Sequence, residues 1–110
     1  MRRGDVVLIL GPDEIGKPRP AVIVQADTLG PKTTAVILCP ISSAEADTPH
    51  IRPAITPDET NGLRAPSHIM TEKIIALRRD RVRTVIGRLS EPDLLRLDEA
   101  LLLVLGLLRP

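Results

Sequence analysis

The sequence predicts a small, mainly β domain that ends in one α-helix. Short apolar runs between proline and glycine turn signals fill most of the 110-residue chain, whereas leucines at three- and four-residue spacing occur only near its end. The chain has no Phe, Trp or Tyr, so its core must be aliphatic. Strands first and one helix last indicate an antiparallel barrel or tightly curled sheet with a terminal helix. We expect a single domain, with the barrel at about 1–89 and the helix at about 91–108.

Three apolar runs bounded by turn residues are expected to form the first strands. They cover residues 6–10, 21–24 and 35–39. Gly11 and Pro12 close the first run, and Pro20 opens the second. Pro40 ends the third. Short β-branched runs between such residues are typical of buried strands.

The middle of the chain is expected to consist mostly of loops. Residues 42–66 hold four prolines, an Asn-Gly pair and scattered acids, with one strand around residues 50–55. After this segment, residues 69–77 and 82–89 resemble a strand pair joined through residues 78–81.

The last segment has a helical period. Ser90 and Asp93 form a Ser-x-x-Asp capping signal with Pro92 in the first turn. Apolar residues then recur at helical spacing: Leu94, Leu97, Leu101, Val104 and Leu108. Between residues 100 and 108 only Gly106 interrupts the aliphatic side chains. Both sides of the last two turns therefore need burial, which favours packing on a second copy or a partner and predicts a homodimer.

The composition argues against several classes of site. Without aromatic rings the chain lacks the usual platforms for stacking bases, each worth about 1–3 kcal/mol. The single cysteine, Cys39, excludes an intramolecular disulfide and is expected to be a buried, inert thiol. No nucleotide-binding glycine motif occurs, and His50 and His68 lack metal-ligand spacing, so we expect neither cofactor nor metal. No signal peptide or membrane span is evident, so we expect a cytoplasmic protein.

The charges are unevenly distributed, although the net charge is only +1. Six basic residues gather between positions 73 and 88: Lys73, Arg78, Arg79, Arg81, Arg83 and Arg88. This segment is either a basic face for a polyanion or a solvated strand edge that guards against aggregation.

Two short stretches suggest an anion site. Arg19 stands between two prolines at the start of an expected strand, which stiffens the backbone on both sides. Ser42 and Ser43 follow the next expected strand. If these strand ends are neighbours, a guanidinium and a hydroxyl would suit a phosphate. The alternative is ordinary turn chemistry, with serines capping a loop and a solvated arginine.

Five blocks in order resemble the MazF/PemK family, the toxins of type II toxin–antitoxin pairs. They are residues 3–7, 17–25 with their Lys-Pro-Arg-Pro strand, 39–43 with Cys-Pro-Ile-Ser-Ser, 66–74 and 86–90. The Leu-rich helix resembles the end of the family pattern. The resemblance implies an SH3-like barrel of the MazF/CcdB type that forms a homodimer. It also implies a sequence-specific, metal-independent endoribonuclease and a MazE-like antitoxin with a disordered acidic C-terminal tail.

By the same resemblance, Arg19 and Ser42 would carry catalysis, with serine where threonine is commoner. The expected contacts to single-stranded RNA are Lys17, Ser43, Asp27, His68, Lys73, Arg78, Arg79 and Arg81. Attack by the 2′-hydroxyl would give a 2′,3′-cyclic phosphate and a 5′-hydroxyl, with Arg19 stabilising the phosphoryl charge. Arginine stays protonated, so the proton acceptor is left open, with either histidine a candidate.

Bases would be read by loop residues 11–17 and 44–66. The alternative readings are a catalytically silent or gyrase-targeting toxin of the same fold, and a structural module. Neither alternative requires Arg19 and Ser42 to meet.

Overall fold

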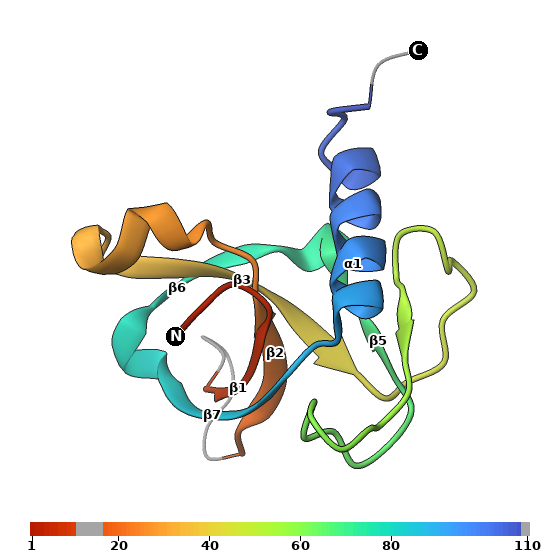
Figure 1. Ribbon diagram of the computed structural model, residues 1–110, viewed down its shortest axis with the longest axis horizontal. Helices are drawn as coiled ribbons and strands as arrows, with labels where there is room; N and C mark the ends of the chain where they lie inside the picture. The colour runs from red at the N-terminus through yellow and green to blue at the C-terminus, as the bar shows by residue number, and fades with distance from the viewer. Residues whose placement is uncertain (11–16, 109–110) are drawn as a thin grey trace.

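The computed structural model describes residues 1–10 and 17–108 (Figure 1). Its strands are β1 (Asp5–Ile9), β2 (Arg19–Ile23), β3 (Ala35–Ser42), β4 (Ala54–Ile55), β5 (Ser67–Ile69), β6 (Ile75–Arg78) and β7 (Val82–Arg88). Three 3-10 helices, η1 (Asp27–Lys32), η2 (Thr71–Lys73) and η3 (Arg79–Arg81), connect strands, and α1 (Glu91–Val104) follows the last strand. The expected class, mainly β with a C-terminal helix, is confirmed.

The strands form one antiparallel, strongly curled sheet. Its order is β4-β5-β3-β2-β1-β7, and β6 pairs with β3 off this path. Figure 1 shows the strands curling around the N-terminal segment, with α1 standing across the sheet. The curl lets short strands enclose a core that a flat sheet of this size could not cover.

Strand β3 connects the two parts of the sheet. At eight residues it is the longest strand of the described chain. One edge pairs with β2; the other pairs first with β6, over residues 35–38, and then with β5, at residues 41–42. The end of β3 is therefore flanked by β2 and β5.

The core is aliphatic, as the composition requires. One cluster lies beneath the helix and includes Val22, Ile41, Ile69 and Leu97. A second cluster fills the curl of the sheet and includes Ile23 and Leu38. Residues alternate between the two clusters along β2 and β3 because successive side chains of a strand point to opposite faces. This explains why the runs in the sequence are continuously apolar: both faces are covered along most of β2 and β3, although Ile37 of β3 is exposed.

The strand expected at residues 69–77 is wrong as one element. Strand β5 ends at Ile69, η2 intervenes, and β6 starts at Ile75. The break has a physical cause: the chain leaves the second half of β3 and returns to pair with its first half. The hydroxyl of Thr71, within the break, donates a hydrogen bond to the carbonyl of Ile51.

The expected pairing of residues 69–77 with 82–89 is also wrong among the described residues. Strand β6 pairs with β3, whereas β7 pairs with β1. The two strands are consecutive along the chain, joined by η3, and lie on different neighbours. The strand expected around residues 50–55 is reduced to Ala54 and Ile55.

The helix begins as expected and ends earlier than expected. The Ser90 hydroxyl oxygen accepts a hydrogen bond from the Asp93 N–H at 3.3 Å, and Pro92 lies in the first turn. The helix ends at Val104 rather than near residue 108, because Gly106 adopts a left-handed φ of 69°. Its N–H donates to the Leu103 carbonyl, and the next N–H donates to the Leu102 carbonyl. These two bonds form a Schellman motif, which terminates the helix.

Within residues 1–10 and 17–108, no helix combines the length and apolarity needed to cross a membrane.

Candidate active site

The register of β2 and β3 brings their site-bearing ends together. Ala21 pairs with Pro40 and Val22 with Cys39. Continuing this register by two residues sets Arg19, the first residue of β2, opposite Ser42, the last residue of β3. Directly opposed residues project from the same face of an antiparallel sheet. The two strand ends that the sequence left unconnected are therefore neighbours.

The next strand adds a third polar side chain. Ser42 pairs with His68 of β5, and Ile41 pairs with Ile69. Arg19, Ser42 and His68 thus follow one another across three adjacent strands on one face. We call these three residues the polar row.

Arg19 is held at the rim of the sheet. On its other side it pairs with Ile9 of β1, which belongs to the core cluster inside the curl. Pro20 disfavours a helical conformation for the residue before it, which keeps Arg19 extended at the start of β2. Arg19 itself is exposed. Its backbone is fixed by the sheet while its guanidinium can meet a ligand.

Ser42 is half-buried, and its hydroxyl has a defined local partner. The Oγ atom accepts a hydrogen bond from the N–H of Ala44 at 3.1 Å. Such a turn closes the chain just after the strand and engages the oxygen as an acceptor. The hydroxyl hydrogen then remains to donate to an anion beside Arg19.

The partly buried imidazole of His68 has an unusual inner nitrogen. Its Nδ1 atom is buried and has no hydrogen-bond partner in the described chain. The sequence predicts His68 as an RNA contact but does not indicate which residues lie beside it. Its place beside Ser42 comes from the β3–β5 register alone.

The remaining candidates fall into separate groups. Lys17 and Ser43 are exposed and adjoin the polar row along the chain. Lys73 is exposed in η2, close after β5. The backbone carbonyl of Arg81 accepts from the N–H of Leu10, just beyond the end of β1 that pairs with Arg19.

Arg78 and Arg79 lie at the other end of β3 from Ser42. Arg78 pairs with Ala35, the first residue of β3, about 23 Å of extended strand away from Ser42. The Arg79 guanidinium donates to the carbonyls of Gly30 at 2.7 Å and Thr33 at 2.8 Å. Arg79 therefore ties η3 to the segment before β3.

Asp27 likewise follows the far end of β2. Its Oδ1 atom accepts a hydrogen bond from the Arg3 N–H at 2.7 Å. The structure does not bring Asp27 to the polar row, and its contact fixes the N-terminal segment.

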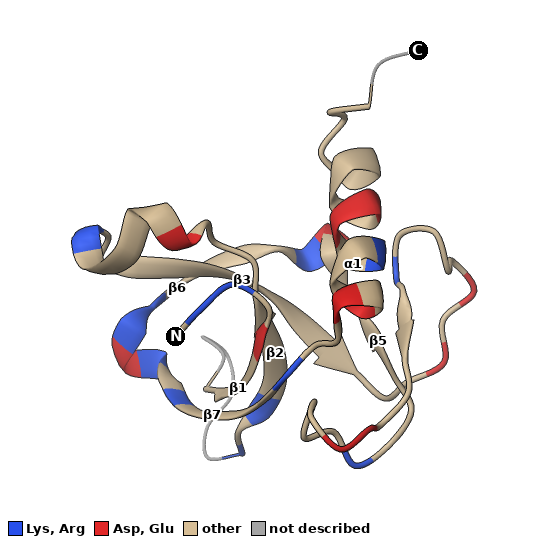
Figure 2. Ribbon diagram, in the orientation of Figure 1, with Lys and Arg blue, Asp and Glu red and all other residues tan. Residues whose placement is uncertain are grey.

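Basic side chains gather on one side of the molecule. Figure 2 shows Lys and Arg at the turn between β6 and β7, where Asp80 also lies, along β7 and before and at the start of β2, whereas Asp and Glu occur together with basic residues in α1 and in the loops beside β5. We call Lys17, Arg19, Arg78, Arg79, Arg81 and Arg83 together the basic surface, and the polar row begins at its member Arg19.

Comparison with known proteins identifies the family. A family model described as the PemK-like, MazF-like toxin of type II toxin–antitoxin systems matches residues 2–105. The chain belongs to this toxin family. A curated relative from Mycolicibacterium smegmatis, named "Probable endoribonuclease MazF", is 36% identical over 108 residues, which cover 97% of this chain and 98% of the relative. The resemblance seen in the sequence is confirmed, and the name of this relative agrees with the expected class of enzyme.

Solved structures of toxins share the fold. An endoribonuclease from Mycobacterial species, in complex with its cognate antitoxin, superposes with a TM-score of 0.85 at 20% identity and covers 100% of this chain and 99% of its own. MazF from Deinococcus radiodurans superposes with a TM-score of 0.78 at 17% identity, with 96% of each chain covered.

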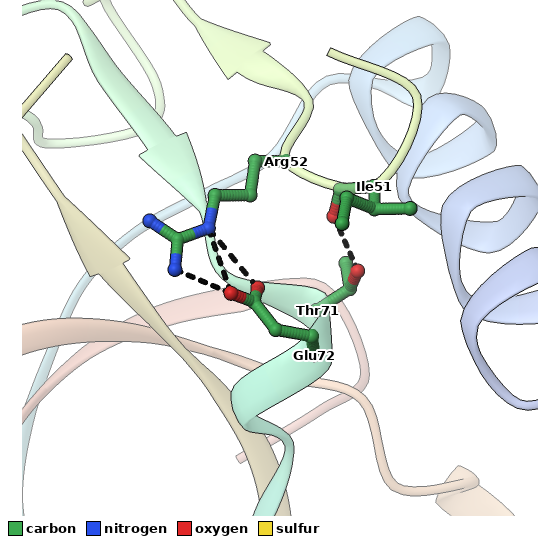
Figure 3. A network of polar contacts seen from close by, with 4 residues as sticks. All are labelled: Ile51, Arg52, Thr71 and Glu72. Atoms are coloured by element: carbon green, nitrogen blue, oxygen red, sulfur yellow. Dashed lines mark hydrogen bonds and ion pairs between the residues drawn. The ribbon is translucent and has the colours of Figure 1, made fainter. Parts of the chain in front are cut away.

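Two polar contacts of this toxin have no signal in the sequence. Arg52 and Glu72 form a bidentate ion pair in which Nε of Arg52 lies 2.8 Å from Oε2 of Glu72. Beside it, the hydroxyl of Thr71 donates to the carbonyl of Ile51 (Figure 3). We call these two contacts the loop clamp, because they attach the loop after β3 to η2. The partners are separated by 20 residues along the chain, so no local pattern indicates the clamp.

The pKa values of the clamp residues reflect their pairing. The hydrogen bond from Arg52 lowers the pKa of Glu72, and the same bond raises the pKa of Arg52. Both groups therefore stay charged at neutral pH.

The cysteine of this toxin is not a candidate nucleophile. Cys39 is fully buried in β3, and burial raises the pKa of its thiol to about 12. A neutral thiol is a poor nucleophile, as the sequence suggested.

Residues 11–16, most of the first of the two loops expected to read bases, lie outside the described residues. Within the described ranges, no group of three or more His, Cys, Asp and Glu side chains could hold a metal ion.

Proposed function

We propose that this toxin is a sequence-specific endoribonuclease that cleaves single-stranded RNA in the cytoplasm without a metal ion. The observation that carries the proposal is the register that sets Arg19 opposite Ser42. The Arg19 guanidinium and the Ser42 hydroxyl, on one face of the sheet, provide hydrogen-bond donors for the phosphate of a phosphodiester.

The proposed reaction is an internal transfer of the phosphoryl group. The 2′-oxygen forms a bond to phosphorus, the bond to the 5′-oxygen breaks, and the products are a 2′,3′-cyclic phosphate and a 5′-hydroxyl. The 2′-hydroxyl loses a proton and the 5′-oxygen gains one. Arg19 and Ser42 stabilise the charge that builds on the non-bridging oxygens, where loss of one donor typically costs ~10²–10³ in rate.

The RNA strand would extend from the polar row along the basic surface. We expect Lys17, Ser43 and Arg81 to contact RNA near the scissile phosphate, and Lys73 and Arg78 to contact more distant phosphates. Phosphate contacts supply affinity without the aromatic stacking that this chain lacks. Arg79 and Asp27, with their structural partners, would act on RNA only through the segments they hold.

The toxin would work as a homodimer and be neutralised by an antitoxin. Large hydrophobic residues are exposed at the end of α1 and beyond it: Leu102, Leu103, Leu105, Leu107 and Leu108. Together with Leu29 and Ile37, three of them line an apolar groove of about 510 Å³. A second copy would cover this groove. An antitoxin with an acidic tail would complement the basic surface and compete there with RNA.

End-group analysis of cleaved RNA tests the proposal. Purified toxin, freed of antitoxin, should give 2′,3′-cyclic phosphate and 5′-hydroxyl ends with EDTA present. Arg19→Ala should lower the cleavage rate by at least ~10²-fold. Lys32→Ala, which removes an exposed positive charge at the far end of β3, serves as control and should cleave normally.

Two results would contradict the proposal. The first is the absence of cleavage on a panel of single-stranded RNAs, or cleavage only with added magnesium. The second is growth arrest by the Arg19→Ala variant equal to that by the wild type, which would favour a toxin that acts by binding a protein such as gyrase.

A further inference from the structure

His68 is the member of the polar row that the proposed reaction does not yet use. Its Cα is paired with that of Ser42, and side chains of directly paired residues start about 4.5–5.5 Å apart on the same face. On the other side of β5, His68 pairs with Ala54, which is exposed and has only a methyl group. The imidazole therefore starts on the same face as the Ser42 side chain, with only a methyl group at the paired position on its other flank.

The surroundings of Nδ1 indicate which nitrogen carries the hydrogen. This atom is buried without a partner in the described chain. A buried N–H without an acceptor is rarer and costlier than a buried lone pair. The neutral ring is then best accommodated with its hydrogen on Nε2. In this form the outer nitrogen is a donor.

We propose that His68 is a third hydrogen-bond donor to the scissile phosphate. Its Nε2–H binds a non-bridging oxygen, next to the Ser42 hydroxyl and the Arg19 guanidinium. The ring keeps its proton throughout, so it stabilises charge and does not act as the base. This inference rests on the proposed ribonuclease function and names a further catalytic residue for it.

Three replacements of His68 separate donation from proton transfer. The amide nitrogen of glutamine can reach the position of Nε2, whereas that of asparagine reaches only the position of Nδ1. Leucine provides no donor. His68→Leu and His68→Asn should lower kcat by ~10²-fold, whereas His68→Gln should stay within about tenfold of the wild type.

A binding measurement distinguishes a catalytic donor from a structural residue. RNA with a 2′-O-methyl group at the scissile position cannot react. Its dissociation constant should change by less than about threefold in His68→Leu, because donors aimed at developing charge act mainly in the transition state. Thermal unfolding of each variant verifies that the fold is intact. Because His68→Gln and His68→Asn both carry a polar amide, a difference in kcat between them reports the position of the donor.

The outcomes that overturn the proposal are specific. Activity of His68→Leu equal to that of the wild type removes His68 from catalysis. Equal loss in His68→Gln and His68→Leu would show that the ring must transfer a proton. Arg19→Ala is assayed in parallel: if it is inactive while His68→Leu is active, only the His68 inference fails. If the wild type cuts no RNA, the proposed function itself fails, and the inference with it.

Discussion

Ser42 shows how a single hydroxyl can be oriented by its backbone. Its oxygen is engaged by the Ala44 N–H, and its Cα lies between two paired strands. Serine has more freedom at χ1 than threonine, the residue that the family resemblance suggests is commoner here. The local turn restores part of the order that the missing methyl group would supply.

This argument predicts the behaviour of two replacements at position 42. Ser42→Thr keeps the hydroxyl on a residue suited to a strand, so kcat should stay within about threefold of the wild type or rise. Ser42→Val has the same shape as threonine without the hydroxyl and should lose ~10²–10³ in kcat. Single-turnover cleavage of a short RNA measures both. Equal rates for the two variants would contradict a catalytic hydroxyl.

At the residue scale, local signals in the sequence pointed to only part of the site. A meeting of Arg19 and Ser42 could be stated only as a hypothesis, because prolines mark the ends of two successive strands and successive strands usually pair. The position of His68 beside Ser42 could not be deduced, because it depends on the register between β3 and β5 across a 24-residue connection. The structural contacts of Arg79 could not be deduced either, because charge patterns do not reveal carbonyl partners 46 and 49 residues away.

At the element scale, the loop clamp explains how a proline-rich connection is ordered. The loop leaves β3 at Ser42 and returns at β4, and its last part is attached to η2 by Arg52 and Ile51. The same η2 follows β5 directly, so the loop that borders Ser42 and the strand that carries His68 share one anchor.

Breaking the clamp should release the loop without unfolding the sheet. Arg52→Ala removes the ion pair, so a Glu-specific protease should cut after the exposed Glu45 several-fold faster than in the wild type. Arg78→Ala, which breaks the highly exposed pair with Asp80, is the matched control and should leave the cutting rate unchanged. Identical digestion of all three proteins would show that the clamp does not order the loop.

The same clamp should respond to acid. The pKa of Glu72 is lowered in the fold by Arg52, so its contribution is complete above the ordinary glutamate pKa and is lost as the pH falls through the lowered value. Backbone amide shifts of Ile51 and Arg52 should follow this titration in the wild type.

Element boundaries were predictable where local chemistry decides them. The capping residues correctly predict the start of α1. Its end is predicted near residue 108, but the helix ends at Val104 because Gly106 has a left-handed φ. The break between β5 and β6 was not predictable, since Ile69 to Leu77 is continuously compatible with a strand and only the pairing with β3 divides it.

At the scale of the whole molecule, the apolar groove beside α1 predicts the oligomeric state. Leu105→Asp would place a carboxylate in the contact with a second copy, at a cost of several kcal/mol. The dimer dissociation constant should rise at least ~100-fold in sedimentation velocity experiments. Leu95→Asp alters an exposed leucine of α1 outside the groove and should leave the dimer intact. A wild type that sediments as a monomer at micromolar concentration would contradict this prediction.

Under the proposed function, the pairing of β3 would also set when a newly made chain acquires its complete site. Arg19 and Ser42 can adjoin once β2 and β3 have been synthesised, but the second edge of β3 stays open until residues 67–78 follow. Contacts this distant in sequence form late in folding. During translation, therefore, Arg19 and Ser42 can adjoin before His68 joins them in the polar row. A chain terminated before residue 67 would lack His68, and the second edge of its β3 would stay unpaired.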